Sequence, residues 1–268
     1  MQSIIFAHAN SFPASTYRVL FDNLRARGYT VQALEKVGHD PRYPVSNNWP
    51  QLVQQLADFA AEVVTQQGEP AFLVGHSLGG LLSLMTAARH PELARGVLLL
   101  DSPLVGGWRA TTLGAFKRTK MVETVSPGKI SKGRRQHWPS QQAALEHFQS
   151  KKAFARWDPQ VLQDYVAHGM QDLDGKRVLG FDRAVETAIY NTLPHNLESL
   201  LRHHPLKCPA AFIGGTQSAE MRQVGMALTD KVTRGRTMML DGSHLFPMEK
   251  PLATAAAIEA ALRNMGGG

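Results

Sequence analysis

A serine with a glycine two positions before it and another two positions after it lies where an apolar run meets a helical pattern. Residues 75–80 (GHSLGG) follow the apolar run AFLV and lead into the helical pattern LLSLMTAARH. A nucleophile placed between a strand and a helix sits on a tight turn, which requires small residues two positions before and after it. Gly75 and Gly79 meet this requirement, and the helix directs its N-terminal amides toward an oxyanion formed beside Ser77. We therefore predict that Ser77 is a nucleophile.

A histidine motif follows near the other end of the chain. Residues 241–251 (DGSHLFPMEKP) come directly after an expected strand at 237–240 and contain His244. Together with the serine turn, and in the order Ser then His, this motif resembles those of α/β hydrolases with a helical cap. The resemblance extends over nearly the whole chain. It implies that His244 is the general base that accepts the proton of Ser77.

A third motif follows the first expected strand. Residues 7–10 read AHAN where the family usually has His-Gly and then an oxyanion-hole residue. By that match, the backbone N–H groups of Asn10 and Leu78 hold the developing oxyanion, and His8 holds the loop in place. Ala9 replaces the usual glycine, so the backbone of this loop departs from the family pattern.

The acidic member of the triad departs further from the pattern. The family usually places it a few residues after the strand that corresponds to AAFIGG, but this chain has Gln217 and Ser218 there. Asp101 ends the apolar run GVLLL, and a carboxylate at the carboxyl end of a central strand faces the site crevice. Glu220 lies two residues past the usual place. We expect Asp101 to complete the triad, with Glu220 and an acid-free dyad as the alternatives.

Apolar runs alternate with helical patterns over most of the chain. This alternation predicts an α/β fold, a doubly wound sheet with right-handed crossovers. The first run starts near residue 3, so the two strands that precede it in the family have no sequence from which to form. We predict about six strands, all parallel. Expected strands lie at 4–7, 29–34, 71–74, 96–100, 210–213 and 237–240, and expected helices at 15–27, 51–66, 78–90, 220–231 and 252–263.

The alternation breaks between residues 103 and 206. This stretch has helix-like pieces and no convincing strand pair, so we predict a core domain at 1–102 and 207–268 and a helical cap at 103–206. Two glycine-containing pieces, 121–133 and 168–180, are candidate hinges. Aromatic residues of the cap are candidates for lining an acyl pocket: Trp108, Trp138, Phe148, Phe154, Trp157 and Tyr165.

Charge and composition limit the classes of partner. With 29 Lys+Arg against 22 Asp+Glu the formal charge is +7. The segment 109–135 contains eight basic residues and a single acidic one, Glu123. This segment is either a solvated face or a site of attraction for an anionic substrate or surface. Too few aromatics accompany it to favour a nucleic-acid partner. A single cysteine, Cys208, excludes an internal disulfide, and no metal-ligand spacing is present, so we expect no metal and no cofactor.

These patterns together predict a serine hydrolase that cleaves a small-molecule carboxylic ester through an acyl-enzyme. The same residues would serve a lipase, a thioesterase, an amidase, a carbon–carbon bond hydrolase or a perhydrolase, and the cap decides among them. A hydrolase-like binding protein without catalysis is the alternative from another class. No signal-peptide pattern or long apolar run is evident, so we expect a cytoplasmic monomer or homodimer without membrane insertion.

Overall fold

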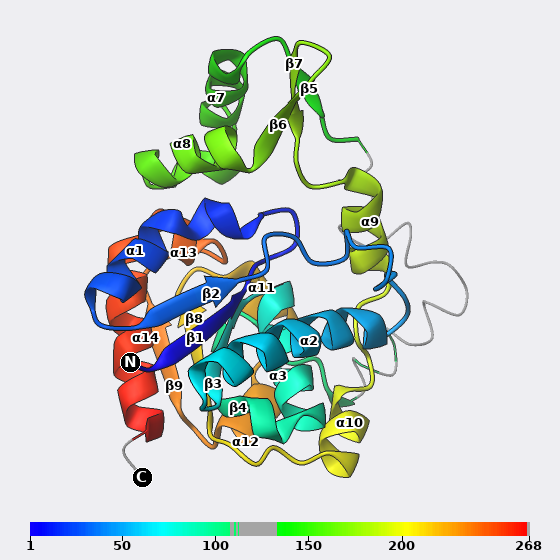
Figure 1. Ribbon diagram of the computed structural model, residues 1–268, viewed down its shortest axis with the longest axis vertical. Helices are drawn as coiled ribbons and strands as arrows, with labels where there is room; N and C mark the ends of the chain where they lie inside the picture. The colour runs from blue at the N-terminus through cyan, green and yellow to red at the C-terminus, as the bar shows by residue number, and fades with distance from the viewer. Residues whose placement is uncertain (108–109, 111, 113–132, 267–268) are drawn as a thin grey trace.

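Six parallel strands form the centre of the computed structural model, which describes residues 1–107, 110, 112 and 133–266 (Figure 1). They are β1 (Ser3–Ala7), β2 (Thr30–Ala33), β3 (Ala71–His76), β4 (Ala94–Leu100), β8 (Ala210–Gly215) and β9 (Thr237–Leu240). Their order across the sheet is β2-β1-β3-β4-β8-β9, and every neighbouring pair is parallel. The predicted α/β-hydrolase sheet of six parallel strands is therefore confirmed.

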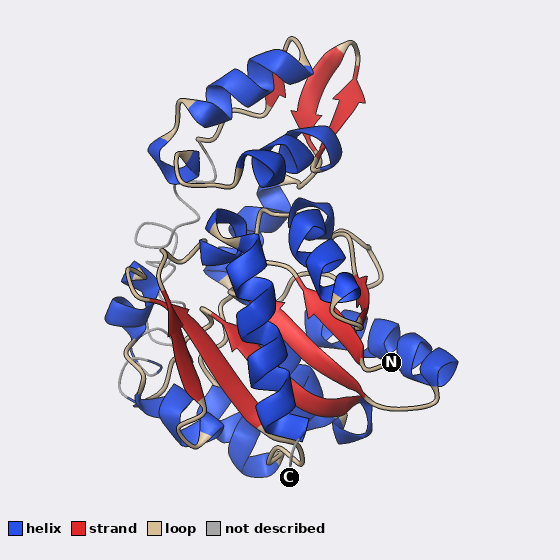
Figure 2. Cartoon of the chain, turned by 90° about the vertical axis from the view of Figure 1, so that its left-hand side faces the viewer, coloured by secondary structure: helices blue, strands red, loops and turns tan. Residues whose placement is uncertain are grey.

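Helices cover both faces of this sheet (Figure 2). Side chains alternate along each strand, so Ile4 and Phe6 of β1 join one apolar cluster while Ile5 and Ala7 join the other. One face packs against α1 (Arg18–Ala26) and α14 (Pro251–Gly266). The other packs against α2 (Pro50–Gln67), α3 (Leu78–Arg89), α10 (Leu197–His203) and α12 (Ala227–Thr233). Burial on both faces explains why the strands read as continuous apolar runs.

Short helices complete the connections. They are the one-turn helices η1 (Ala14–Tyr17) and η2 (Pro91–Leu93), with α11 (Ala219–Val224) and α13 (Phe246–Glu249). The helix predicted at 220–231 is two helices, because Gly225 between them has a φ of 78° and ends α11. Within the described part of the chain, no helix combines the length and the apolar character needed to cross a bilayer.

A smaller unit, called the cap below, lies over one end of the sheet (Figure 1). Its described elements are β5 (His137–Trp138), α7 (Gln141–Gln149), η3 (Lys152–Phe154), α8 (Pro159–His168), β6 (Met170–Leu173), β7 (Lys176–Leu179) and α9 (Arg183–Asn191). Strands β5, β7 and β6 form an antiparallel sheet, so the expectation of no strand pair within 103–206 was wrong. Helix α10, at the end of this stretch, packs against α3. The domain boundaries themselves stay a prediction.

The candidate hinge at 168–180 is a β-hairpin. Asp174 and Gly175 form its two-residue turn with φ values of 49° and 69°. Both central residues of such a turn need positive φ, and an Asp-Gly pair is therefore a strong hairpin signal. The prediction of a hinge at 168–180 overlooked this hairpin signal. The other candidate hinge, 121–133, lies outside the described residues except for Gly133.

Aromatic residues pack the interior of the cap. The rings of Trp138 and Phe148 lie tilted at 5.2 Å between centroids, and those of Phe154 and Trp157 at 4.7 Å. Phe12 of the core joins them, 5.3 Å from Trp157. Most of these rings therefore pack against each other. The remaining predicted aromatic, Trp108, and most of the basic segment lie outside the described residues, namely Arg109, Lys117, Arg118, Lys120, Glu123, Lys129 and Lys132.

Two glycines allow the backbone of the serine turn to approach its neighbours closely. A Cβ added to Gly75 would lie 2.2 Å from the backbone of Gly79. A Cβ added to Gly79 would lie 1.9 Å from the carbonyl oxygen of Ala7. Both distances are far below any van der Waals contact, so β1, β3 and α3 can meet here only with glycine at these positions.

Replacing Gly79 by alanine should therefore destabilise the fold. The methyl group meets backbone atoms, which cannot rotate away, so we expect G79A to lower the free energy of unfolding by about 3 kcal/mol or more. Urea unfolding measures this. Gly266 is the control, because a Cβ there meets nothing within 4 Å, and G266A should change stability by less than about 0.5 kcal/mol. Equal stability of G79A and the wild type would contradict this account of the turn.

His8 is buried and holds the loop after β1. Its ring accepts a hydrogen bond from the Val37 N–H at 2.9 Å and donates from Nδ1 to the Ala9 carbonyl at 2.8 Å. Burial lowers the pKa of His8 from 6.5 to about 4, although the Ala9 carbonyl opposes the shift. The folded protein thus keeps His8 neutral over a pH range in which the unfolded chain binds a proton.

His8 should make stability fall with acidification. Its contribution is complete above pH 6.5 and is lost as the pH falls from 6.5 toward 4, at up to about 1.4 kcal/mol per pH unit. The variant H8Q should therefore show a shallower dependence of unfolding free energy on pH in this window, measured by urea titration at several pH values. The exposed His204 supplies the control H204Q, with an unchanged slope. A wild-type slope in H8Q would exclude this role.

Candidate active site

Ser77 occupies a sharp turn between β3 and α3. Its backbone has φ 54° and ψ −114°, a conformation that residues other than glycine rarely adopt. The turn is held by a hydrogen bond from the Ser77 N–H to the Leu100 carbonyl at 3.0 Å. The serine is the residue before the first turn of α3, so the N-terminal end of that helix lies beside its hydroxyl.

The loop between β9 and α13 brings His244 to this serine. His244 Nε2 lies 3.0 Å from Ser77 Oγ. The loop is held by Glu249, whose carboxylate accepts hydrogen bonds from the Ser243 N–H at 3.0 Å and the Ser243 hydroxyl at 2.5 Å. Glu249 was part of the sequence motif, but its contact with Ser243 was not predicted.

Asp101 reaches the other nitrogen of the same ring. Its Oδ2 lies 2.6 Å from His244 Nδ1, and the residue is fully buried. The Gly215 N–H donates to Oδ1 at 2.7 Å, and the Ser218 hydroxyl donates to Oδ2 at 2.6 Å. These bonds fix the orientation of the carboxylate and stabilise its charge.

Glu220 also lies close to the ring, but less favourably. Its Oε2 is 3.8 Å from His244 Nδ1, and its side chain is 46% exposed. The structure thus brings both predicted acids to His244, and only Asp101 is within hydrogen-bond distance. Ser218, one of the two residues at the place where the family pattern led us to expect an acid, donates a hydrogen bond to Asp101 instead.

The same three residues are a conceivable cation site. Among the described residues, Asp101, Glu220 and His244 each offer a ligand atom, and these atoms lie within 4.8 Å of one another. However, the 2.6 Å distance between Asp101 and His244 is that of a hydrogen bond, shorter than the ~3.3 Å between two ligands of a tetrahedral metal. The arrangement fits an imidazole held by a carboxylate better than a metal centre.

The predicted oxyanion donors lie on two adjacent segments. Leu78 begins α3, and Asn10 lies in the loop after β1. Gly79, next to Leu78, packs against the backbone of Ala7, where that loop begins. Within the described part of the chain, neither backbone N–H donates to a protein acceptor. Two amides without an acceptor among the described residues, both on residues of the segments around the Ser77 turn, match the chemistry of an oxyanion hole.

A cap residue that the sequence did not reveal holds the Asn10 loop. Glu186 of α9 accepts a hydrogen bond from Asn10 Nδ2 at its carbonyl (3.1 Å) and from Ser11 Oγ at its carboxylate (2.5 Å). Arg134 lies 3.3 Å from the same carboxylate, which is buried. Ser11 itself has a φ of 80°. No sequence signal connects residues this far apart along the chain.

A pocket of about 450 Å³ opens beside the serine and histidine. Asn10 and Tyr190 form part of its wall, and η3 of the cap contributes Lys152. Arg156 also lines it, donates to Gln217 Oε1 at 2.6 Å and lies 3.3 Å from Glu249. The cap and the core therefore enclose the site jointly. Burial, reinforced by the charge of Glu186, raises the pKa of Tyr190 to about 12, so Tyr190 adds a neutral hydroxyl to this wall.

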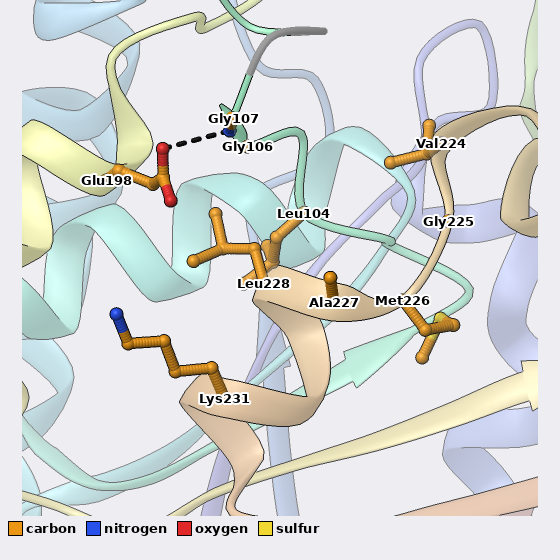
Figure 3. Close-up of a pocket in the computed structure, with 10 residues that line it drawn as sticks. All are labelled: Leu104, Gly106, Gly107, Glu198, Val224, Gly225, Met226, Ala227, Leu228 and Lys231. Atoms are coloured by element: carbon orange, nitrogen blue, oxygen red, sulfur yellow. Dashed lines mark hydrogen bonds between the residues drawn. The ribbon is translucent and has the colours of Figure 1, made fainter.

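A second pocket of about 500 Å³ lies elsewhere, beside α10 and α12 (Figure 3). Leu104 and Leu228 form its apolar floor, and Glu198 accepts a hydrogen bond from the Gly107 N–H at 2.9 Å. None of the predicted site residues lines it. The chemistry-bearing residues are therefore gathered at the other pocket.

Similar proteins point to one fold. The solved structure of E-2-(acetamidomethylene)succinate hydrolase superposes with a TM-score of 0.73 at 20% identity, covering 100% of this chain and 92% of that one. A monoglyceride lipase homolog of monkeypox virus is 26% identical over 132 residues, a match that spans 46% of each protein. A probable alcohol acetyltransferase of Cyberlindnera fabianii is 24% identical over 287 residues, covering 96% of this chain and 70% of that protein.

A family model also matches most of the chain. A model described as the alpha/beta hydrolase family covers residues 4–257. This range includes every strand of the parallel sheet except the first residue of β1, and it includes the serine turn and the histidine loop. By its sequence and its fold, the chain belongs to the α/β-hydrolase family.

Proposed function

We propose that this protein is a serine hydrolase that cleaves a carboxylic ester through a covalent acyl-enzyme. Ser77 is the nucleophile, His244 the general base and Asp101 the acid that orients it. The observation that supports this most strongly is the chain of contacts from Ser77 Oγ through His244 (3.0 Å) to Asp101 (2.6 Å), beside a pocket of about 450 Å³. The dyad without an acid has no such support.

Acylation begins at the serine hydroxyl. His244 donates its Nδ1–H to Asp101, so its Nε2 is free to accept the Ser77 proton as Oγ attacks the acyl carbon. The carbonyl oxygen becomes an oxyanion, which the N–H groups of Asn10 and Leu78 stabilise together with the N-terminal end of α3. The imidazolium then gives its proton to the leaving alcohol as the ester bond breaks.

Deacylation repeats these steps with water. His244 takes a proton from a water molecule, whose oxygen attacks the acyl carbon, and the second oxyanion occupies the same two amides. When it collapses, the bond to Ser77 Oγ breaks and the proton returns to Oγ. The products are a carboxylic acid and the regenerated serine.

The cap, proposed at 103–206, decides which ester fits. It adds Lys152 and Tyr190 to the pocket wall, beside Phe12 of the core. The two relatives are named as a monoglyceride lipase homolog and a probable alcohol acetyltransferase, and both names refer to an acyl group on an alcohol oxygen. This supports an ester over an amide or a carbon–carbon bond as the substrate to test first.

The first test is covalent labelling. A fluorophosphonate reacts with an activated serine, so mass spectrometry of the intact protein should show a single adduct. Peptide mapping should place this adduct on Ser77. S77A should give no adduct, and H244A should react at least ~100-fold more slowly because no base accepts the proton.

A substitution away from the site serves as the control for this test. Ser199, an α10 residue away from the pocket, supplies the control S199A, which should label at the wild-type rate. An unlabelled wild-type protein would overturn the proposed activity. The hydrolase-like binding protein without catalysis would then be the better description.

The identity of the acid is a separate prediction. D101N should lower kcat by roughly 10³- to 10⁴-fold, because an amide neither fixes the imidazole tautomer nor stabilises the imidazolium. E220Q should change kcat by less than about threefold, because the exposed Glu220 makes no hydrogen bond to the ring. Steady-state hydrolysis of a chromogenic acyl ester measures both. The reverse order would assign the acid to Glu220.

A further inference from the structure

A continuous row of hydrogen bonds runs behind the catalytic residues. The Ala9 N–H donates to Tyr17 Oη at 3.1 Å, and Tyr17 Oη lies 2.7 Å from His76 Nδ1. His76 Nε2 lies 2.9 Å from the backbone carbonyl of His244. Tyr17 comes from η1 and His76 from the end of β3. The row therefore connects the oxyanion loop, the serine turn and the histidine loop.

Only one set of proton positions satisfies every group in this row. A carbonyl oxygen cannot donate, so His76 Nε2 carries the proton that goes to His244. Nδ1 of a neutral ring must then accept, and the hydrogen comes from the Tyr17 hydroxyl. That leaves the lone pairs of Tyr17 Oη for the Ala9 N–H. Each donor has an acceptor, and the direction of every bond is fixed.

Burial keeps this arrangement of protons in place. Tyr17 is 1% exposed and His76 is 0% exposed. Burial, together with the charge of the nearby His244 ring, 5.2 Å away between centroids, lowers the pKa of His76 to about 3. Burial also raises the pKa of Tyr17. His76 is therefore neutral and does not compete with His244 for the serine proton.

We propose that Tyr17 and His76 are positioning residues that hold the oxyanion loop and the histidine loop at a fixed separation across the serine turn. This rests on the proposed function, since it assigns a role in the same reaction. Neither residue touches the substrate. Tyr17 acts through Ala9 on the neighbouring amide of Asn10, and His76 acts through the backbone of His244.

The environment of Ala9 explains why the Tyr17 hydroxyl matters. Ala9 is buried, and its carbonyl is already held by His8. Without Tyr17 Oη its N–H has no acceptor, so the loop gains by shifting to find one. Such a shift moves the Asn10 N–H away from the point where the oxyanion forms. His76 Nδ1 loses its donor at the same time, which loosens the contact with the His244 loop.

The variant Y17F tests this by removing one oxygen atom. We expect kcat for a chromogenic acyl ester to fall roughly 10- to 100-fold while KM stays within about twofold, because the ground state makes little use of the oxyanion amides. The affinity for an alkyl boronic acid, which forms a tetrahedral adduct on serine, should fall by a similar factor. A loss of stability alone would change neither quantity in protein that circular dichroism shows to be folded.

Tyr43 supplies a matched control. Its hydroxyl donates to Asp58 at 2.6 Å, away from the pocket, so Y43F removes a hydrogen bond of similar length. Y43F should keep the wild-type kcat and boronic acid affinity. Comparable losses in Y43F and Y17F would overturn the proposal, because the effect would then be general to tyrosine hydroxyls.

His76 gives a second, independent variant pair. Glutamine can place an N–H where Nε2 stands, so H76Q keeps a donor for the His244 carbonyl, whereas H76L removes every hydrogen bond of the ring. We expect kcat in the order wild type, H76Q, H76L, with H76Q within roughly tenfold of the wild type. This pair keeps the proposal testable if Y17F does not fold. Equal kcat for H76Q and H76L would contradict it.

The fluorophosphonate reaction separates failure of this proposal from failure of the proposed function. A wild type that labels Ser77 and a Y17F variant with unchanged kcat and boronic acid affinity would overturn only the positioning role. A Y17F variant that raises KM and leaves kcat unchanged would do the same. A wild type that does not label would overturn the hydrolase itself and this role with it.

Discussion

The backbone of Ser77 is held in a conformation that a serine adopts only under constraint, and the rest of the site depends on it. A positive φ at such a residue costs roughly 1–3 kcal/mol. The hydrogen bond to Leu100, the start of α3 and the contact of Gly79 with Ala7 offset that cost. The last of these contacts also brings the loop after β1 to the N-terminal end of α3. The segments that carry Asn10 and Leu78 therefore adjoin because the turn is tight.

The position of the acid follows from the register of the sheet. Leu100 at the end of β4 pairs with Ile213 of β8, so Asp101 and the loop that contains Ser218 leave the sheet side by side. A carboxylate from either loop can reach the ring nitrogen of one histidine. In this chain Asp101 supplies it, and Ser218 donates to it and caps α11 by accepting from the Met221 N–H. Asp101 thus reaches His244 Nδ1 from the end of β4, while the loop after β8 supplies a hydroxyl that binds the same carboxylate.

Local patterns predicted the parts of the structure that depend on neighbouring residues. Apolar runs predicted the strands, and the spacing of glycines predicted the turn at Ser77, because both features are determined within a few residues. The choice between Asp101 and Glu220 stayed open, since it depends on strand register and on how far each side chain reaches. Tyr17, His76 and Glu186 gave no signal, because their partners are distant in sequence. The missed hairpin at Asp174 was a different error, since its Asp-Gly turn was readable.

The cap meets the core through contacts of unequal strength. On the α9 side, Glu186 is buried and binds Asn10 and Ser11 directly, so separating them leaves buried polar groups unpaired. On the η3 side, Arg156 is exposed and bridges to Gln217 and Glu249, where water can replace it. An unpaired buried group costs more than a broken exposed bond. The Arg156 bridges are therefore the weaker polar contacts between cap and core, and on that side the packing of Phe12 against Trp157 adds an apolar contact.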